Sequence, residues 1–186
     1  MTKQIFQIKI VLKGSKPRIW RRILIPSNLS LSDFHLAIQV VMGWTNSHLH
    51  QFIKDDLYYT MRLQDDDFWD EMNYIDYKGM MIRNLLSKEK DRVIYEYDFG
   101  DSWIHDVLLE AIVPKDSTLK YPVCLAGKMS CPPEDCGGIW GYADMLEILK
   151  NPEHEEYESY VEWLDEDFDP KYFSVEEVNK RLRLVF

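Results

Sequence analysis

Two alternating segments around a tight turn constrain the fold of this chain most strongly. Residues 93–98 alternate apolar and polar side chains, and residues 103–109 do the same after a turn that contains Gly100. A period of two residues is typical of a strand with one buried face, and a short polar turn between two such runs predicts a β-hairpin. The chain is therefore expected to contain antiparallel sheet.

The N-terminal third predicts more strands of the same kind. Residues 4–12 and 19–25 alternate on either side of a turn at 14–17, so they are expected to form a second hairpin, which Pro26 ends because proline cannot donate to a strand ladder. Residues 49–61 predict a shorter hairpin. The stretch 62–79 has no clear period and is expected to be a long surface loop, which would suit a lid.

Helices are predicted between the strands of the sequence and after them. Ser30 followed by Asp33 resembles a capping box before an apolar stripe that ends at Gly43. Helical spacing returns within 142–149, 157–164 and, after a second capping box at Ser174, 175–185. Strands followed mainly by helices predict an α+β fold in which helices cover one face of a mostly antiparallel sheet. Residues 1–186 show no linker or repeat and are expected to form a single domain.

The composition bears on where in the cell the protein is expected to be found. The sequence has no apolar run near the roughly 18 residues that a membrane helix needs, and its start lacks a signal-peptide profile. Three cysteines, an odd number, favour a reducing environment over a disulfide framework. These features predict a cytoplasmic protein without membrane association.

The net charge of −10 disfavours general nucleic-acid binding, because an acidic protein repels phosphate backbones at long range. The charge is uneven, however, with seven basic side chains and no acid within residues 1–32, and nine acids without Lys or Arg within 151–170. The basic first hairpin could still touch nucleic acid through four side chains: Lys16, Arg18, Arg21 and Arg22. The favoured interpretation is that it neutralises the acidic segment of the same or a neighbouring molecule.

Three segments combine polar chemistry with glycines or prolines that fix the backbone: 48–52, 98–105 and 131–138. We expect them to form one polar cleft. The candidates to line that cleft are Trp44, His48, His50, Trp103, Asp135 and Trp140, with Trp69 of the 62–79 loop as a further aromatic. The candidates for acid–base chemistry are Asp98, Asp101, His105 and Glu134. A simpler alternative is that Asp98 and Asp101 accept hydrogen bonds from amides of their own turn.

The same segments contain donors for a divalent metal, of which zinc suits them best. The metal-ligand candidates are His48, His50, His105, Cys131 and Cys136. A second cysteine pair, which a ribbon-type zinc site would need, is absent from the sequence. The alternative is that Cys131 and Cys136 are small buried thiols that brace the loop around Pro132 and Pro133.

Five ordered motifs resemble the plasmid pRiA4b ORF-3-like family over nearly the whole chain. They are Pro17-Arg18-Ile19-Trp20-Arg21-Arg22, the run 44–52, the run 95–103, the run 131–138 with Gly141-Tyr142, and Phe168-Asp169-Pro170. The resemblance implies an α+β roll with a curved sheet of hairpins. It implies little about activity, because the family is largely uncharacterised. Some members carry a transposon-resolvase label, but this sequence has no serine-recombinase motif.

Two functions remain open from the sequence. The first is a binding or interaction domain that holds a small ligand, a protein partner or a metal in the cleft without turnover. The alternative is a metal-dependent hydrolase or nucleic-acid-processing enzyme linked to mobile elements. An enzyme requires histidine and carboxylate side chains to converge within a few ångströms, whereas a structural role lets them point apart.

Overall fold

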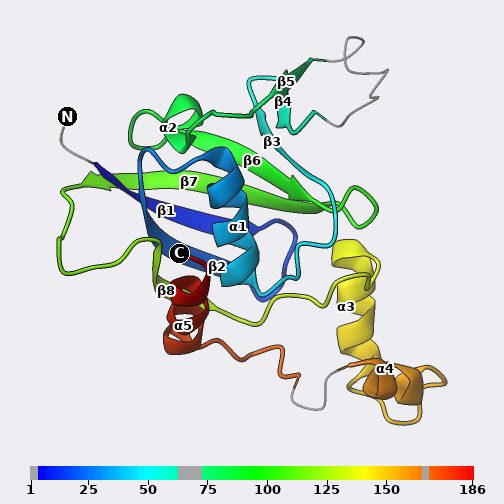
Figure 1. The fold of residues 1–186 in the computed structure, drawn as a ribbon. Helices are drawn as coiled ribbons and strands as arrows, with labels where there is room; N and C mark the ends of the chain where they lie inside the picture. The colour runs from blue at the N-terminus through cyan, green and yellow to red at the C-terminus, as the bar shows by residue number, and fades with distance from the viewer. Residues whose placement is uncertain (1–3, 63–72, 165–167) are drawn as a thin grey trace.

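The computed structural model describes residues 4–62, 73–164 and 168–186 (Figure 1). The strands are β1 Ile5–Leu12, β2 Trp20–Pro26, β3 His50–Lys54, β4 Leu57–Thr60, β5 Tyr74–Asp76, β6 Arg92–Tyr97, β7 Trp103–Val113 and β8 Val123–Lys128. The helices are α1 Leu31–Met42, α2 Ile82–Leu85, α3 Gly138–Ile148, α4 Tyr157–Trp163 and α5 Val175–Val185.

All eight strands form one sheet in the order β5-β4-β3-β6-β7-β1-β2-β8. Every pairing is antiparallel except that of β4 with β5. The register shifts between Gln7 and Ile8 and between Arg22 and Ile23, and such bulges bend a sheet. The three predicted hairpins and the α+β class, with a mostly antiparallel sheet, are confirmed.

One face of the sheet is buried under helices. Phe6, Ile8, Ile10 and Leu12 of β1 are all at most 2% exposed, while Gln7 and Lys9 between them are only partly buried. Helices α1 and α5 contact each other on this face, whereas α3 and α4 lie beyond the strand ends (Figure 1). The capping predictions hold as well: Ser30 accepts from the amide of Asp33, and Gly43 ends α1 in the left-handed conformation.

Two strands were not predicted. Residues 74–76 form β5 inside the stretch that was expected to be loop, and 63–72, which include Trp69, lie outside the described residues. Strand β8 lies between the predicted 103–109 strand and the first C-terminal helical pattern at 142–149, in a stretch for which no element was predicted. It pairs with β2, forms the edge of the sheet and contacts α5.

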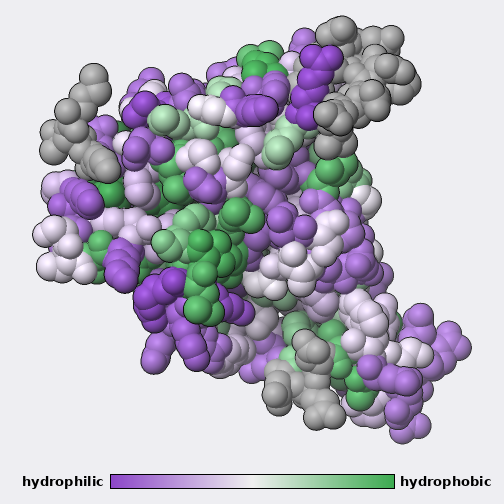
Figure 2. Space-filling model, viewed as in Figure 1, coloured by the Kyte–Doolittle hydropathy of each residue, from purple (hydrophilic) through white to green (hydrophobic). Residues whose placement is uncertain are grey.

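The outer surface near the C-terminus is apolar. Figure 2 shows apolar residues gathered near the C-terminal end of α5, where Leu184, Val185 and Phe186 are all at least 45% exposed. The buried side of α5 is carried by Val178 and Leu182, each 1% exposed. The helix thus attaches to the protein through a narrow stripe and needs polar contacts to fix its position.

We predict that Asn179 of α5 stabilises β8. Its side chain accepts from the amide of Cys124 at 2.7 Å and donates to the carbonyl of Cys124 at 2.9 Å, so it substitutes for a neighbouring strand. Replacing Asn179 with Ala should lower the free energy of unfolding by about 1–3 kcal/mol, the value of two part-buried hydrogen bonds. Urea denaturation measures this, with the exposed Asn151→Ala as control. Equal stability of the two variants would contradict the prediction.

Candidate functional site

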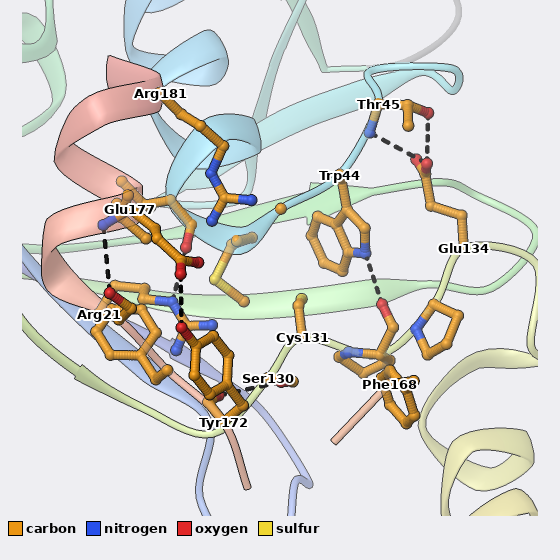
Figure 3. A pocket seen from close by; sticks show the side chains of 18 of the residues that line it. Arg21, Trp44, Thr45, Ser130, Cys131, Glu134, Phe168, Tyr172, Glu177 and Arg181 are labelled. Carbon is orange, nitrogen blue, oxygen red and sulfur yellow. Dashed lines mark hydrogen bonds between the residues drawn. The ribbon is translucent and has the colours of Figure 1, made fainter. Parts of the chain in front are cut away.

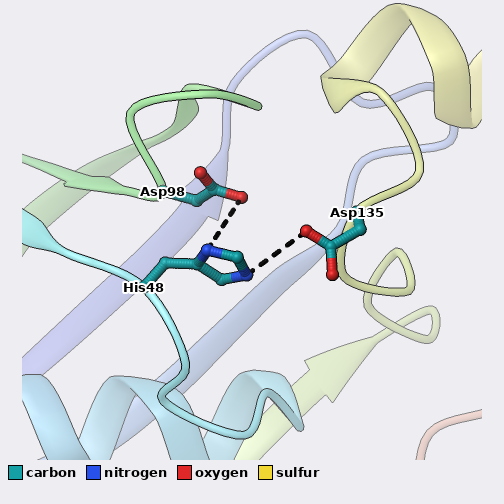
Figure 4. A group of neighbouring side chains, drawn as sticks. All are labelled: His48, Asp98 and Asp135. Carbon is teal, nitrogen blue, oxygen red and sulfur yellow. Dashed lines mark ion pairs between the residues drawn. The ribbon is translucent and has the colours of Figure 1, made fainter.

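The three segments expected to form a cleft meet at His48. This residue lies between α1 and β3, Asp98 follows β6, and Asp135 precedes α3. The imidazole stands between the two carboxylates, with Nδ1 3.7 Å from Asp98 Oδ2 and Nε2 3.4 Å from Asp135 Oδ1 (Figure 4). In the part of the chain that the structure describes, this is the one group of three His, Cys, Asp or Glu side chains whose donor atoms lie within 4.8 Å of one another.

The turn after β6 fixes Asp98. Its φ of 58° is in the left-handed region, its Oδ1 accepts from the amide of Gly100 at 2.9 Å, and its own amide donates to the Leu49 carbonyl at 2.9 Å. Aspartate often closes turns in this way. One carboxylate oxygen therefore serves the turn, as the simpler alternative proposed, and the other faces His48.

Glu134 connects the loop that carries Asp135 to the rest of the site. One of its oxygens accepts from the Tyr97 hydroxyl, and the other accepts from the amide and hydroxyl of Thr45 at 3.1 and 2.5 Å. The indole of Trp44 adds a hydrogen bond of 3.0 Å to the Pro132 carbonyl. Glu134 was a candidate acid–base group, but its geometry is that of a positioning residue.

The aromatic candidates form the floor beneath this site rather than its lining. The Trp44 ring stacks on that of Tyr97, with 5.0 Å between ring centroids, and makes a T-shaped contact with His105 at a centroid distance of 5.2 Å. Trp103 and His105 are at most 1% exposed. Trp103, expected to line the cleft, and His105, a candidate for acid–base chemistry and for a metal, therefore do not face an open cleft, because their alternating positions on β7 point them into the core. Trp140, by contrast, is 80% exposed on α3.

His50 does not join the His48 group. Its ring stacks on His35 at 3.4 Å between centroids, and its Nε2 lies 2.7 Å from the Tyr77 hydroxyl. Burial lowers the pKa of His50 to about 3 and that of His35 to about 4. Both rings are thus neutral parts of a buried polar network, in which the two ring nitrogens of His35 are hydrogen-bonded to Tyr95 and Asn46.

The cysteines are protonated thiols; Cys124 and Cys136 are buried, and Cys131 is partly buried. Burial raises the pKa of Cys136 to about 12 and also raises the pKa of Cys131. Metals bind the deprotonated thiolate, so these raised pKa values disfavour metal binding by the two cysteines. The charge of Asp101 adds to the effect at Cys136, and Asp101 Oδ2 is itself buried without a hydrogen-bond partner. This geometry favours the interpretation that Cys131 and Cys136 brace their loop.

Two of the four basic side chains considered for nucleic acid are engaged elsewhere. Arg21 is 1% exposed, and Arg22 pairs with Glu110, with Nε 2.6 Å from Oε2. Strand alternation directs Arg21 to the helix-covered face of the sheet, which excludes it from an external interface. Lys16 and Arg18 remain exposed.

The fold and the site together define an α+β protein with an open, mostly antiparallel sheet and a histidine–carboxylate group at its surface. The model of the family "Plasmid pRiA4b ORF-3-like protein" matches residues 4–177, and the chain belongs to this family. Over 185 residues it is 34% identical to uncharacterized protein y4hQ of Sinorhizobium fredii, covering 97% of this chain and 91% of the relative.

A solved structure supports the fold. The crystal structure of a protein of unknown function, MM3350 from Methanosarcina mazei Go1, is similar with a TM-score of 0.84 and 38% identity, covering 95% of this chain and 98% of that one. Within the described ranges, no helix combines the length and the apolar character needed to cross a membrane.

We predict that acid destabilises the fold through its buried histidines. Burial lowers the pKa of His35 and of His105 to about 4, whereas histidine in an unfolded chain titrates near 6.5. As the pH falls from 6.5 toward 4, the unfolded chain gains protons that the folded protein does not, so stability is lost. At pH 5 this amounts to about 2 kcal/mol per buried histidine.

Urea denaturation across this pH range tests the prediction. His35→Gln should remove about 2 kcal/mol of the loss between neutral pH and pH 5, while retaining a hydrogen-bonding side chain. His154→Gln, outside the core, is the control. If His35→Gln and the wild type lose stability in parallel, the buried histidine does not cause the acid sensitivity.

Proposed function

We propose that this protein binds a divalent transition metal, with zinc preferred, between His48 and Asp135. The observation that carries the proposal is the position of the His48 imidazole between two carboxylates at the junction of segments 48–52, 98–105 and 131–138. The ion would form the centre of the polar cleft predicted from the sequence. The free thiols of all three cysteines fit the cytoplasmic location expected for such a protein.

The spacing of the donor atoms suits a small ion. Zinc binds imidazole nitrogen and carboxylate oxygen at roughly 2.0–2.2 Å, so neighbouring donors in a tetrahedron lie roughly 3.3–3.6 Å apart. His48 Nε2 and Asp135 Oδ1 are 3.4 Å apart. His48 Nε2 is also shielded from solvent and has no hydrogen-bond partner, so a metal would satisfy it.

Asp98 would act on the other side of the ring. Histidines that bind metals commonly donate their second N–H to a carboxylate, which fixes the tautomer and the ring orientation. Asp98 Oδ2 faces Nδ1 of His48 at 3.7 Å, and its side chain is 11% exposed. The carboxylate of Asp135 is 72% exposed, so the ion would enter from that side.

Two direct protein donors leave positions on the ion for water or for a ligand. A carboxylate, phosphate or peptide group that enters the cleft could bind there, which makes a metal-dependent binding module the favoured function. Formally, the neutral imidazole and two carboxylates carry two negative charges, so a divalent cation neutralises the group.

Calorimetric titration of chelator-treated protein with Zn²⁺ and Mn²⁺ tests this function. We expect one saturable zinc site, weakened at least about 100-fold in His48→Ala and roughly 10- to 100-fold in Asp98→Asn. His154→Ala and Cys131→Ser are controls and should bind like the wild type. Unchanged zinc affinity in His48→Ala would contradict the proposal. Loss of zinc binding in Cys131→Ser would instead indicate that the thiols bind the metal.

A metal-dependent hydrolase is the second candidate, because the open coordination positions would also accept and activate water. With Arg21 buried and Arg22 paired with Glu110, a small substrate fits better than a nucleic acid. The zinc- or manganese-loaded protein should then cleave a chromogenic phosphate diester or carboxylate ester, and Asp135→Asn should abolish that cleavage. If the protein binds the metal fully but cleaves neither ester, the hydrolase is excluded and the binding module remains the proposed function.

A further inference from the structure

A cavity lies behind the loop that carries Asp135. Its volume is about 440 Å³, and it is enclosed by the C-terminal end of α1, the run 130–134, the segment before α5 and α5 itself (Figure 3). Cavities of roughly 300–1,000 Å³ hold most small ligands. His48, Asp98 and Asp135 do not line it, so it is separate from the proposed metal site.

A buried arginine forms the floor of this cavity. Arg21 donates from Nε to the Val41 carbonyl at 2.7 Å and from Nη1 to the carbonyls of Trp20 and Lys128 at 2.9 and 3.0 Å. Among the described residues, Nη2 has no hydrogen-bond partner and no carboxylate lies within ion-pair distance of the guanidinium. A buried cation without an acidic partner is costly, so an anion in the cavity would stabilise it.

The protein holds this guanidinium in a fixed position. The ring of Phe173 lies over it, with 4.2 Å between Cζ and the ring centroid. Gly127 on β8 makes room for this packing, because a Cβ there would lie 2.5 Å from the Phe173 ring and 3.0 Å from Arg21 Cδ. Such preorganisation reduces the entropy that a ligand must lose on binding.

A second arginine reaches the same cavity from α5. Arg181 is exposed at its mouth and forms no ion pair with the residues that the structure describes. Burial lowers the pKa of Arg21, and the nearby charge of Arg181 lowers it further. Both guanidinium groups line one cavity, so an oxyanion bound there would offset the positive charge of both.

The two glutamates of the cavity are engaged by protein donors. Glu177 accepts from the Tyr172 hydroxyl at 2.6 Å, and Glu134 is held by Tyr97 and Thr45. Met42, Trp44 and Phe168 add apolar surface to the wall, beside polar side chains such as Ser130 and Ser174. The cavity therefore combines two guanidinium groups that lack an acidic partner with an apolar part of its wall.

We propose that this cavity binds a small molecule with a carboxylate or phosphate group on an apolar, preferably aromatic, body. The oxyanion would lie between Arg21 and Arg181, since guanidinium donors match the paired oxygens of both groups. The body would lie against Trp44 and Phe168. This site is independent of the metal, although Cys131–Glu134 form a wall of the cavity and Asp135 follows directly in the chain.

Calorimetry with three probes tests the proposal: phenyl phosphate, phenylacetate and the uncharged 2-phenylethanol. We expect at least one anion to bind more tightly than the alcohol, and the preferred anion distinguishes phosphate from carboxylate ligands. Arg181→Gln should weaken anion binding roughly tenfold, as expected for loss of a charged hydrogen-bonding partner. Arg183→Gln, an exposed arginine of the same helix that does not line the cavity, is the matched control.

Arg21→Met provides a second test, with its melting temperature measured in parallel because a buried residue is changed. If the variant folds, its anion binding should be lost; if it does not fold, Arg181→Gln alone decides. The proposal is overturned if neither anion saturates by roughly 10 mM. It is also overturned if the alcohol binds as tightly as both anions, or if Arg181→Gln binds like Arg183→Gln. Asp135→Asn should retain anion binding, which separates this site from the metal.

Discussion

The candidate site depends on the hydrogen bonds of Glu134. This carboxylate joins the end of β6 through Tyr97 to the start of the α1–β3 connection through Thr45, and it lies on the loop that precedes α3. A single carboxylate thus makes polar contacts with two segments that are distant from its own loop in sequence. The hydrogen bond from Trp44 to Pro132 adds a second, partly redundant link. The cost of ordering a loop is thus met by contacts outside the donor group itself.

The loop held by Glu134 borders both proposed sites. Asp135 faces His48, while Cys131 and Pro132 face the cavity above Arg21. A rigid loop between two sites can transmit occupancy from one to the other only if it has two arrangements. The bonds of Glu134 and Trp44 favour one arrangement, so the two proposed sites are expected to act independently.

Most strands and helices could be predicted because strand alternation and helix caps are encoded by residues close together in the sequence. Alternation fixed β1, β2, β6 and β7, and the Ser30 cap with Gly43 set the bounds of α1. Strand β8 escaped prediction because its identity depends on pairing with β2 and on the clamp by Asn179, which no local period reveals. The site was predicted in part: the three segments do meet, but which side chains face one another depends on turns such as that at Asp98. The cavity at Arg21 could not be predicted for the same reason. The sequence shows that Arg21 shares a strand face with apolar residues, but α5, which forms part of the cavity wall, is distant in sequence.

The long-range field of the protein acts differently on the two proposed sites. A net charge of −10 attracts cations and repels anions, so diffusion of a metal ion toward His48 and Asp135 is favoured before any contact forms. An oxyanion approaches against this field and must gain its affinity at short range. Arg21 can supply that affinity because it is already desolvated and its guanidinium is held by three carbonyls and Phe173. Salt screens the long-range repulsion more than the buried contact. A buried, preorganised cation is therefore the physical arrangement through which an acidic protein can bind an anion selectively.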